Sequence, residues 1–194
     1  VDEFILLDSV QYTRRDWRNR NKIKTSQGTA WLTIPVRCKG LYLQRICDTE
    51  IEGTDWAKRH WASLCLHYRR APYFAEYREQ FESLYMGDQS RLLSEVNRKF
   101  LNTVCETLGI VTTITNDSEY QSTTGKNERL LELCLQSGAT EYLSGPAAKG
   151  YLDEELFQKH GIRVLFADYS NYREYVQLFP PFDHAVTVLD LLFN

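Results

Sequence analysis

The densest set of chemically capable side chains lies in residues 14–24, which hold six Lys or Arg residues and one Asp. Guanidinium groups bind phosphate or carboxylate through paired hydrogen bonds, and neighbouring amides add donors. We expect at least one of these arginines to pair with Asp16 instead of a ligand. The residues predicted to bind a substrate in this part of the chain are Gln11, Tyr12, Arg18, Asn19, Arg20, Asn21 and Lys22.

The charge distribution favours a compact anionic ligand. The net charge is −3, and residues 14–24 contribute +5, which leaves −8 for the rest of the chain. A basic island on an acidic body suits a small phosphate or carboxylate better than a long nucleic acid. No RNA-binding signature is present. The predicted partner is therefore a small anionic substrate and not a nucleic acid, and the alternative is a solvated basic loop.

Two residues are candidates for a catalytic role. Asp8 ends an apolar run, and a carboxylate at the carboxyl end of a buried strand can orient a hydroxyl, an amine or a metal. The alternative is that Asp8 caps the next turn. His60 lies beside Trp56 and Trp61 on a predicted helix and is a candidate general base. Its alternative is a packed structural histidine.

Two later segments are predicted to contact the substrate as well. Lys126 and Arg129, together with Thr124, open a predicted helix, and helix N-termini attract anions. The spacing of a phosphate-binding P-loop is absent. Ser144 and Gly145 end a short predicted strand, where a hydroxyl and free N–H groups would face a ligand. The alternative for this pair is a tight turn with a capping serine.

Cysteine and histidine spacing predicts no metal site. The five cysteines form no C-x-x-C pair, and the four histidines show neither H-x-x-x-H nor H-E-x-x-H spacing. We expect reduced thiols in a cytoplasmic protein. No apolar run reaches the roughly 18 residues that a membrane span requires. The sequence identifies no cofactor, and it leaves open whether the chain forms a homo-oligomer.

The elements that must position these side chains follow an α/β pattern. The first half predicts a buried strand over residues 4–8, a hairpin from 22–25 and 30–36, and a strand over 43–51. Helical periodicity then predicts three helices, at 54–70, 73–85 and 91–108.

From residue 110, predicted strands and helices alternate. The strands are at 110–115, 141–145 and 163–168, and the helices lie at 125–137, within 146–160 and at 186–193. This order predicts right-handed crossovers and parallel pairing. The predicted fold class is α/β, a mostly parallel sheet flanked by helices, with a β-hairpin and a helical insertion at about 54–108. A length of 194 residues predicts one domain over residues 1–194.

Motifs spread along the whole chain agree with a known family. They include Asp8 to Tyr12, Asn19 to Ile23, Trp31 to Val36, Trp56, His60, Tyr68 to Tyr73, Asn127 to Leu130, Tyr142 to Gly145, Tyr151-Leu152 and Leu189 to Asn194. On these motifs the chain resembles the WbqC-like family of bacterial proteins, which occurs among genes for O-antigen and other surface polysaccharides.

The resemblance also implies two departures from the family pattern. Family members carry a Pro- and Tyr-rich segment before the position of Val1, so we expect residues 4–8 to be the second strand of the intact protein. Ser9 stands where an aspartate often occurs, which disfavours a metal-binding carboxylate pair at positions 8 and 9.

The resemblance and the basic segment together predict a transferase-type enzyme of bacterial surface-polysaccharide or related small-molecule biosynthesis. Its substrate would be a nucleotide sugar or an amino-acid-like molecule. Asp8 and Gln11 would orient that substrate, the basic segment would hold its anionic group, and Lys126 and Ser144-Gly145 would line the opposite wall. The alternative is a non-catalytic ligand-binding or scaffold protein of the same pathway.

Overall fold

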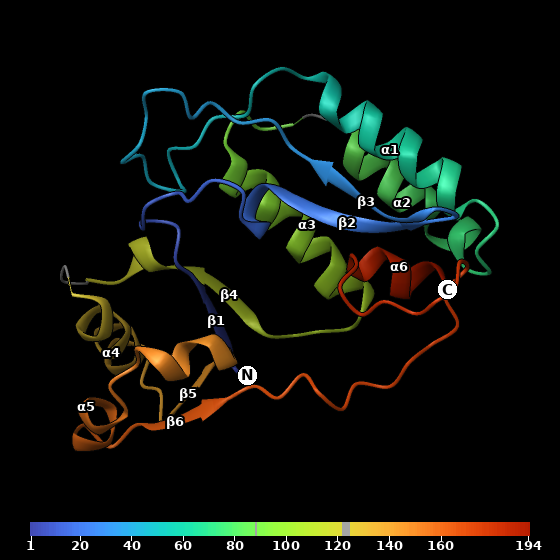
Figure 1. The fold of residues 1–194 in the computed structure, drawn as a ribbon. Helices are drawn as coiled ribbons and strands as arrows, with labels where there is room; N and C mark the ends of the chain where they lie inside the picture. Colours follow the sequence, from blue (N-terminus) through green and yellow to red (C-terminus); the bar gives the residue numbers. More distant parts are fainter. Residues whose placement is uncertain (88, 122–124) are drawn as a thin grey trace. The chain divides into compact units, whose positions relative to one another are not determined.

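The computed structural model describes residues 1–87, 89–121 and 125–194, and the chain forms two compact units (Figure 1). Unit 1 comprises Val1–Ser9 and Val111–Tyr172. Unit 2 comprises Val10–Ile110 and Arg173–Asn194. The prediction of a single domain with a helical subdomain stays a prediction.

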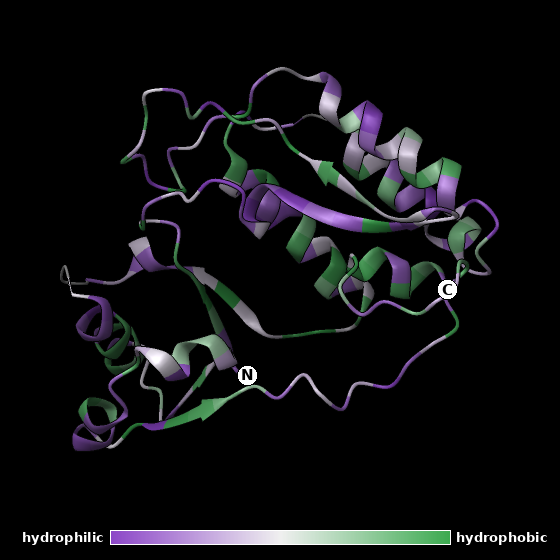
Figure 2. Cartoon of the chain, in the orientation of Figure 1, coloured by the Kyte–Doolittle hydropathy of each residue, from purple (hydrophilic) through white to green (hydrophobic). Residues whose placement is uncertain are grey.

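Unit 2 is built around an antiparallel hairpin of β2 (Arg20–Thr25) and β3 (Gly28–Thr33). Gly28 has a φ of 109°, a left-handed conformation that glycine adopts without steric cost, so the two strands can reverse within a short turn. Lys22 pairs with Trp31 in this register. Figure 2 shows β2 as largely hydrophilic, and Arg20, Lys22 and Lys24 of the basic segment lie on this strand. The predicted hairpin is confirmed.

Three long helices complete the core of unit 2: α1 (Asp55–Tyr68), α2 (Phe74–Met86) and α3 (Leu93–Thr107). They match the three predicted helices to within a few residues. The face of α1 that is buried carries Trp56, Ala57, His60, Trp61, Leu64 and Tyr68. This helical spacing packs large aromatic side chains against α2, where Trp61 stacks between Phe74 and Tyr85.

The C-terminal segment returns to this core through α6 (Val188–Phe193). The ring of Phe193 is fully buried and contacts the rings of Tyr68, Phe74 and Phe81 at centroid distances of 5.4, 5.1 and 5.9 Å. Four aromatic rings thus meet at one point in edge-to-face or tilted geometry, which adds to the stabilisation from buried area.

A buried polar network ties the same segment to the hairpin. Asp190 is fully buried and accepts hydrogen bonds of 2.7 Å from the hydroxyls of Tyr68 and Tyr175. The Tyr68 hydroxyl in turn accepts a bond of 2.8 Å from the backbone N–H of Lys24. Burial raises the pKa of both tyrosines, so they stay protonated and keep donating to the carboxylate.

The predicted strand over residues 43–51 is wrong. This segment makes isolated bridges from Arg45 to Gln11 and from Ile51 to Val36, and turns connect the bridged residues. Its side chains alternate in polarity, but Leu43 is 83% exposed, so the alternation does not mark a buried face. Short local hydrogen bonds, such as Thr49 N–H to the Ile46 carbonyl at 3.1 Å, replace a ladder.

Unit 1 contains two pairs of parallel strands. β1 (Glu3–Leu6) pairs with β4 (Thr113–Asn116), and β5 (Glu141–Ser144) pairs with β6 (Arg163–Phe166). The helical elements of the unit are η2 (Asp117–Glu119), α4 (Lys126–Gln136), η3 (Pro146–Gly150) and α5 (Glu154–Lys159). Arg163 pairs with Glu141 across the second strand pair, and the Tyr142 ring stacks on the Phe157 ring in the small core.

These elements confirm an α/β fold with parallel strands, flanking helices and a hairpin. The parallel strands form two separate pairs of four-residue strands, so the predicted mostly parallel sheet is divided into two short pairs. One further element, η1 (Trp17–Asn19), precedes β2. Within the described residues, no helix has the length and apolar character to cross a membrane.

Candidate functional site

A cavity of about 400 Å³ lies in unit 2 between the hairpin, α1, α3 and the start of α6, and we name it the hairpin cavity. It brings together five residues that the sequence predicted as site residues: Arg18, Asn19, Arg20, Asn21 and His60. The other lining residues are Trp17, Ile23, Leu32, Ile34, Trp56, Leu64, Tyr85, Asn97, Phe100, Leu101, Val104, Thr187, Val188 and Leu189. The cavity thus combines a polar, cationic side with an apolar and aromatic side.

The backbone on the cationic side is fixed by η1. Asp16 caps this turn by accepting a hydrogen bond of 2.6 Å from the backbone N–H of Trp17. The same carboxylate pairs with Arg18, whose guanidinium also donates to the Thr13 hydroxyl at 2.6 Å. The expected arginine partner of Asp16 is therefore Arg18. Two of its five N–H donors thus serve to hold the loop, so Arg18 is a positioning residue for its neighbours.

Two amides anchor the loop to the rest of unit 2. The Asn19 side chain donates to the Ile34 carbonyl at 2.9 Å, and the backbone N–H of Ile34 donates to the Asn19 carbonyl at 2.8 Å. From α3, the Asn97 side chain donates to the Arg18 carbonyl at 2.8 Å. These three bonds fix the position of the residues that lead into β2.

Arg20 is the principal cation of the cavity. Its guanidinium lies over the Trp31 ring at 4.2 Å and donates to the Arg15 carbonyl at 2.5 Å. Its Nε atom is enclosed and makes no hydrogen bond to any described residue. A buried N–H without a partner costs free energy, and it indicates a missing acceptor. Trp31 also faces Lys22 and packs against Trp17, so an aromatic support holds two cations in place.

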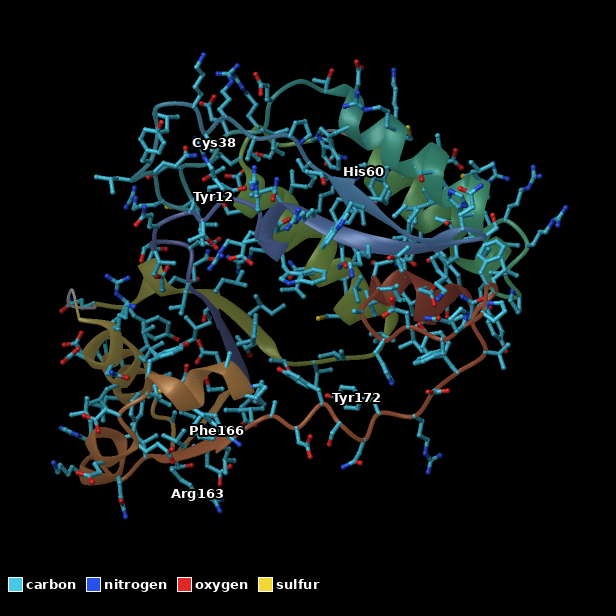
Figure 3. The ribbon with its side chains drawn as sticks, in the orientation of Figure 1. Tyr12, Cys38, His60, Arg163, Phe166 and Tyr172 are labelled. Carbon is cyan, nitrogen blue, oxygen red and sulfur yellow. The ribbon has the colours of Figure 1, made fainter. Side chains whose placement is uncertain are left out.

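His60 lies on α1, and Figure 3 labels it beside the hairpin. Its Nε2 atom is 3.0 Å from the Thr33 carbonyl, so this nitrogen carries the proton and donates. Burial lowers the pKa of the ring, which leaves it neutral near pH 7. The remaining nitrogen, Nδ1, is then a proton acceptor in a residue that lines the cavity.

The apolar side of the cavity is aromatic. Trp56, Tyr85 and His60 form a cluster with ring centroids 5.3 to 6.3 Å apart, and Phe100 packs edge-on against Tyr85 at 4.8 Å. Burial raises the pKa of Tyr85, so its hydroxyl stays neutral. Flat aromatic walls suit a ring-shaped or apolar ligand portion.

Gln11 and Tyr12 do not line the hairpin cavity. The Gln11 side chain donates to the Tyr42 carbonyl at 2.6 Å and holds a surface loop. Tyr12 lines a second hollow with Arg14, Arg15, Asn19, Val36 and Cys38. Asn19 therefore borders both spaces.

The remaining predicted residues belong to unit 1. Asp8 is half-buried and follows β1 after Leu7, and Lys126 is exposed at the first position of α4. Arg129 lies one turn later and is half-buried. Ser144 is the last residue of β5, and Gly145 caps η3 with extended backbone. Thr124 lies outside the described residues. Unit 1 thus gathers Ser144 and Gly145 at one strand end.

Several lining residues were not predicted. Trp17, Asn97 and Phe100 come from segments that sequence spacing does not connect. No local signal marks Asn97, because its partner, the Arg18 carbonyl, lies 79 residues earlier in the chain. Among the described residues that line the hairpin cavity, none is Asp or Glu. No cluster of His, Cys, Asp or Glu that could hold a metal ion occurs within residues 1–87, 89–121 and 125–194.

Comparison with known proteins places this geometry in a family context. The sequence model of the WbqC-like protein family matches residues 1–194. The uncharacterized protein Rv1507c of Mycobacterium tuberculosis is 52% identical over 194 residues, which cover 100% of this chain and 84% of that protein. No solved structure shows significant similarity.

Proposed function

We propose a function for this chain, which belongs to the WbqC-like protein family: it is a cytoplasmic transferase of bacterial surface-polysaccharide or related small-molecule biosynthesis. The hairpin cavity would bind an anionic substrate with a flat or apolar portion, such as a nucleotide sugar or an amino-acid-like molecule. The aromatic side would hold the flat portion, and Arg20 would bind the anionic group.

The observation that carries this proposal is the state of Arg20. Its guanidinium is held by Trp31 and the Arg15 carbonyl, yet its enclosed Nε has no acceptor. No carboxylate among the described lining residues neutralises it. A fixed guanidinium with an unpaired donor beside an aromatic cavity is suited to a phosphate or carboxylate.

His60 is the proposed general base for the transfer step. Its neutral Nδ1 can accept a proton from a substrate hydroxyl or amine, and the bond to Thr33 fixes the ring orientation. Asp8 is a proposed substrate-orienting residue of unit 1. Lys126, Arg129, Ser144 and Gly145 are proposed substrate contacts on that unit.

Calorimetric titration with uridine diphosphate glucose and a panel of other nucleotide sugars tests the binding proposal. Arg20→Gln should weaken binding about tenfold or more, because a hydrogen bond to a charged group contributes roughly 1.5–3 kcal/mol. Arg70→Gln is a matched control, since Arg70 is exposed after α1 and does not line the cavity. Equal affinity of the wild type and Arg20→Gln would contradict the proposal.

A second candidate function is a non-catalytic ligand-binding or scaffold protein of the same pathway. It is favoured by the bond between His60 and the Thr33 carbonyl, because a histidine engaged in this way also serves as a structural residue. Turnover distinguishes the two functions. Loss of turnover with retained binding in His60→Gln or Asp8→Asn would support the enzyme, and binding without turnover in the wild type would support the scaffold.

A further inference from the structure

A second hollow in unit 2 has the features of an additional binding site. It has a volume of about 500 Å³ and is lined by Tyr12, Arg14, Arg15, Asn19, Val36 and Cys38. We name it the outer hollow. Only Asn19 is shared with the hairpin cavity, so the two spaces are lined by almost separate sets of residues.

Tyr12 presents an unpaired donor to this hollow. The residue is only 6% exposed, but its hydroxyl oxygen stays accessible at the hollow and makes no hydrogen bond to any described residue. Burial raises the pKa of Tyr12, which keeps the hydroxyl protonated. Figure 3 shows Tyr12 and Cys38 near one another, in agreement with their shared lining of the hollow. An accessible hydroxyl without a partner in the protein can donate to a ligand acceptor.

Arg15 supplies a free cation. Its side chain is exposed and forms no hydrogen bond, ion pair or ring contact with the described part of the chain. Its φ of 59° lies in the left-handed region, which is strained for a residue with a long side chain. The Arg20 guanidinium holds this conformation by donating to the Arg15 carbonyl at 2.5 Å. Such local strain is common where a side chain must point towards a ligand.

Arg14 adds a second, already fixed cation. Its guanidinium donates to the Cys38 carbonyl and lies 5.2 Å from the centre of the Tyr42 ring. A guanidinium has five N–H donors, so this arrangement leaves others for a ligand. No described residue that lines the hollow is acidic.

We propose that the outer hollow binds the oxyanion of a second small-molecule substrate, a phosphate or carboxylate group, through the Arg15 guanidinium and the Tyr12 hydroxyl, with Arg14 as a supporting cation. The proposal goes beyond the function of the hairpin cavity, because it adds a second site. Two anion sites that share one asparagine would suit the proposed transfer reaction if both of its substrates are anionic.

Protection of Cys38 from alkylation tests this site directly. The rate of Cys38 modification by iodoacetamide is measured by peptide mass spectrometry with inorganic phosphate, with succinate and with sodium chloride at matched ionic strength. We expect phosphate, succinate or both to slow the modification. Protection by only one of them identifies the oxyanion as a phosphate or a carboxylate. If neither protects Cys38 more than chloride does, the proposal is overturned.

Two variants separate binding from folding. Asn tolerates the left-handed conformation, so Arg15→Asn should retain the unfolding midpoint of the wild type and require about tenfold more anion for the same protection. Tyr12→Phe should also weaken protection without loss of stability, because the hydroxyl that it removes makes no hydrogen bond within the described part of the protein.

The matched control is Lys39→Asn, which removes the same charge beside Cys38 from a residue that does not line the hollow. If Lys39→Asn and Arg15→Asn lose protection equally, the loss comes from the change in net charge near Cys38 and not from a specific site, and the proposal is overturned. Nucleotide-sugar binding that depends on Arg20 reports on the hairpin cavity. Failure of either site is therefore visible without failure of the other.

Discussion

Units 1 and 2 use their polar residues in opposite ways. In unit 1 the polar side chains near the strand ends satisfy one another. Buried Asp117 accepts a 3.2 Å bond from the Ser9 backbone and a second bond from its hydroxyl, and Asp168 accepts two bonds from Ser170. In unit 2, by contrast, the enclosed Nε of Arg20, at the start of β2, has no acceptor among the described residues. Groups left unpaired next to a cavity are better indicators of a ligand than groups at a strand end.

The stability of unit 2 explains how it can retain unpaired groups. Its aromatic core and the Asp190 network hold the helices and the hairpin together, and Tyr12 packs into the same core. Each unpaired donor costs roughly 1–3 kcal/mol. A core with several fully buried aromatic side chains can offset this cost, since each such side chain contributes a similar or larger amount.

The largest expected effect is on the stability that the aromatic core gives to unit 2. Phe193→Ala should lower the free energy of unfolding by about 3–5 kcal/mol, because it removes a fully buried ring from the cluster with Tyr68, Phe74 and Phe81. Urea denaturation of the wild type and variant measures the loss. The matched control is Tyr172→Ala, an exposed aromatic residue of unit 1 that Figure 3 labels. A loss below about 1 kcal/mol for Phe193→Ala would show that the core is not centred on this ring.

The second prediction concerns the buried carboxylate of Asp117 in unit 1. Asp117→Asn should cost about 1–3 kcal/mol of stability, because an amide has one acceptor oxygen where the carboxylate has two. It should leave nucleotide-sugar affinity unchanged, since this carboxylate serves the fold. The two measurements are urea denaturation and calorimetric titration. A selective loss of affinity at unchanged stability would show that the Asp117 carboxylate itself contacts the ligand, which would contradict its structural role.

The smallest effect concerns pH. Burial lowers the pKa of His60 from its ordinary value of 6.5, so the unfolded chain binds the proton more tightly than the folded chain. The contribution of His60 to stability is therefore complete above about pH 6.5 and declines as the pH falls from there towards the folded-state pKa. Urea denaturation at about pH 7.5 and about pH 5.5 should show a smaller decline for His60→Gln than for the wild type. Identical declines would mean that His60 is not shielded from solvent.

Much of the fold follows from the sequence because its signals are local. The hairpin, the helices of both units and the short parallel strands follow from apolar periodicity and turn residues, as in the run from Leu93 to Thr107. The strand predicted for residues 43–51 is wrong because alternating polarity alone does not show whether one face of the segment is buried.

The candidate site was only partly predictable, for a physical reason. The density of basic residues identified Arg18 to Asn21, and the aromatic surroundings of His60 identified that residue. Nothing local shows that Trp31 supports Arg20, that Arg15 adopts a left-handed conformation, or that the Tyr12 hydroxyl lacks a partner. Each of these depends on contacts made after the hairpin and the loop have folded. Ligands commonly bind at the carboxyl ends of parallel strands, so the sequence also predicted site residues in unit 1, such as Asp8 and Ser144.

Hydrogen–deuterium exchange with and without uridine diphosphate glucose shows which unit binds the ligand. We expect the ligand to slow exchange in residues 12–22 and 30–36 of unit 2, which border the hairpin cavity and the outer hollow. Arg20→Gln should abolish this protection at the same ligand concentration. Protection confined to the strand ends of unit 1, around Asp8 and Ser144, with none in residues 12–22, would contradict this expectation.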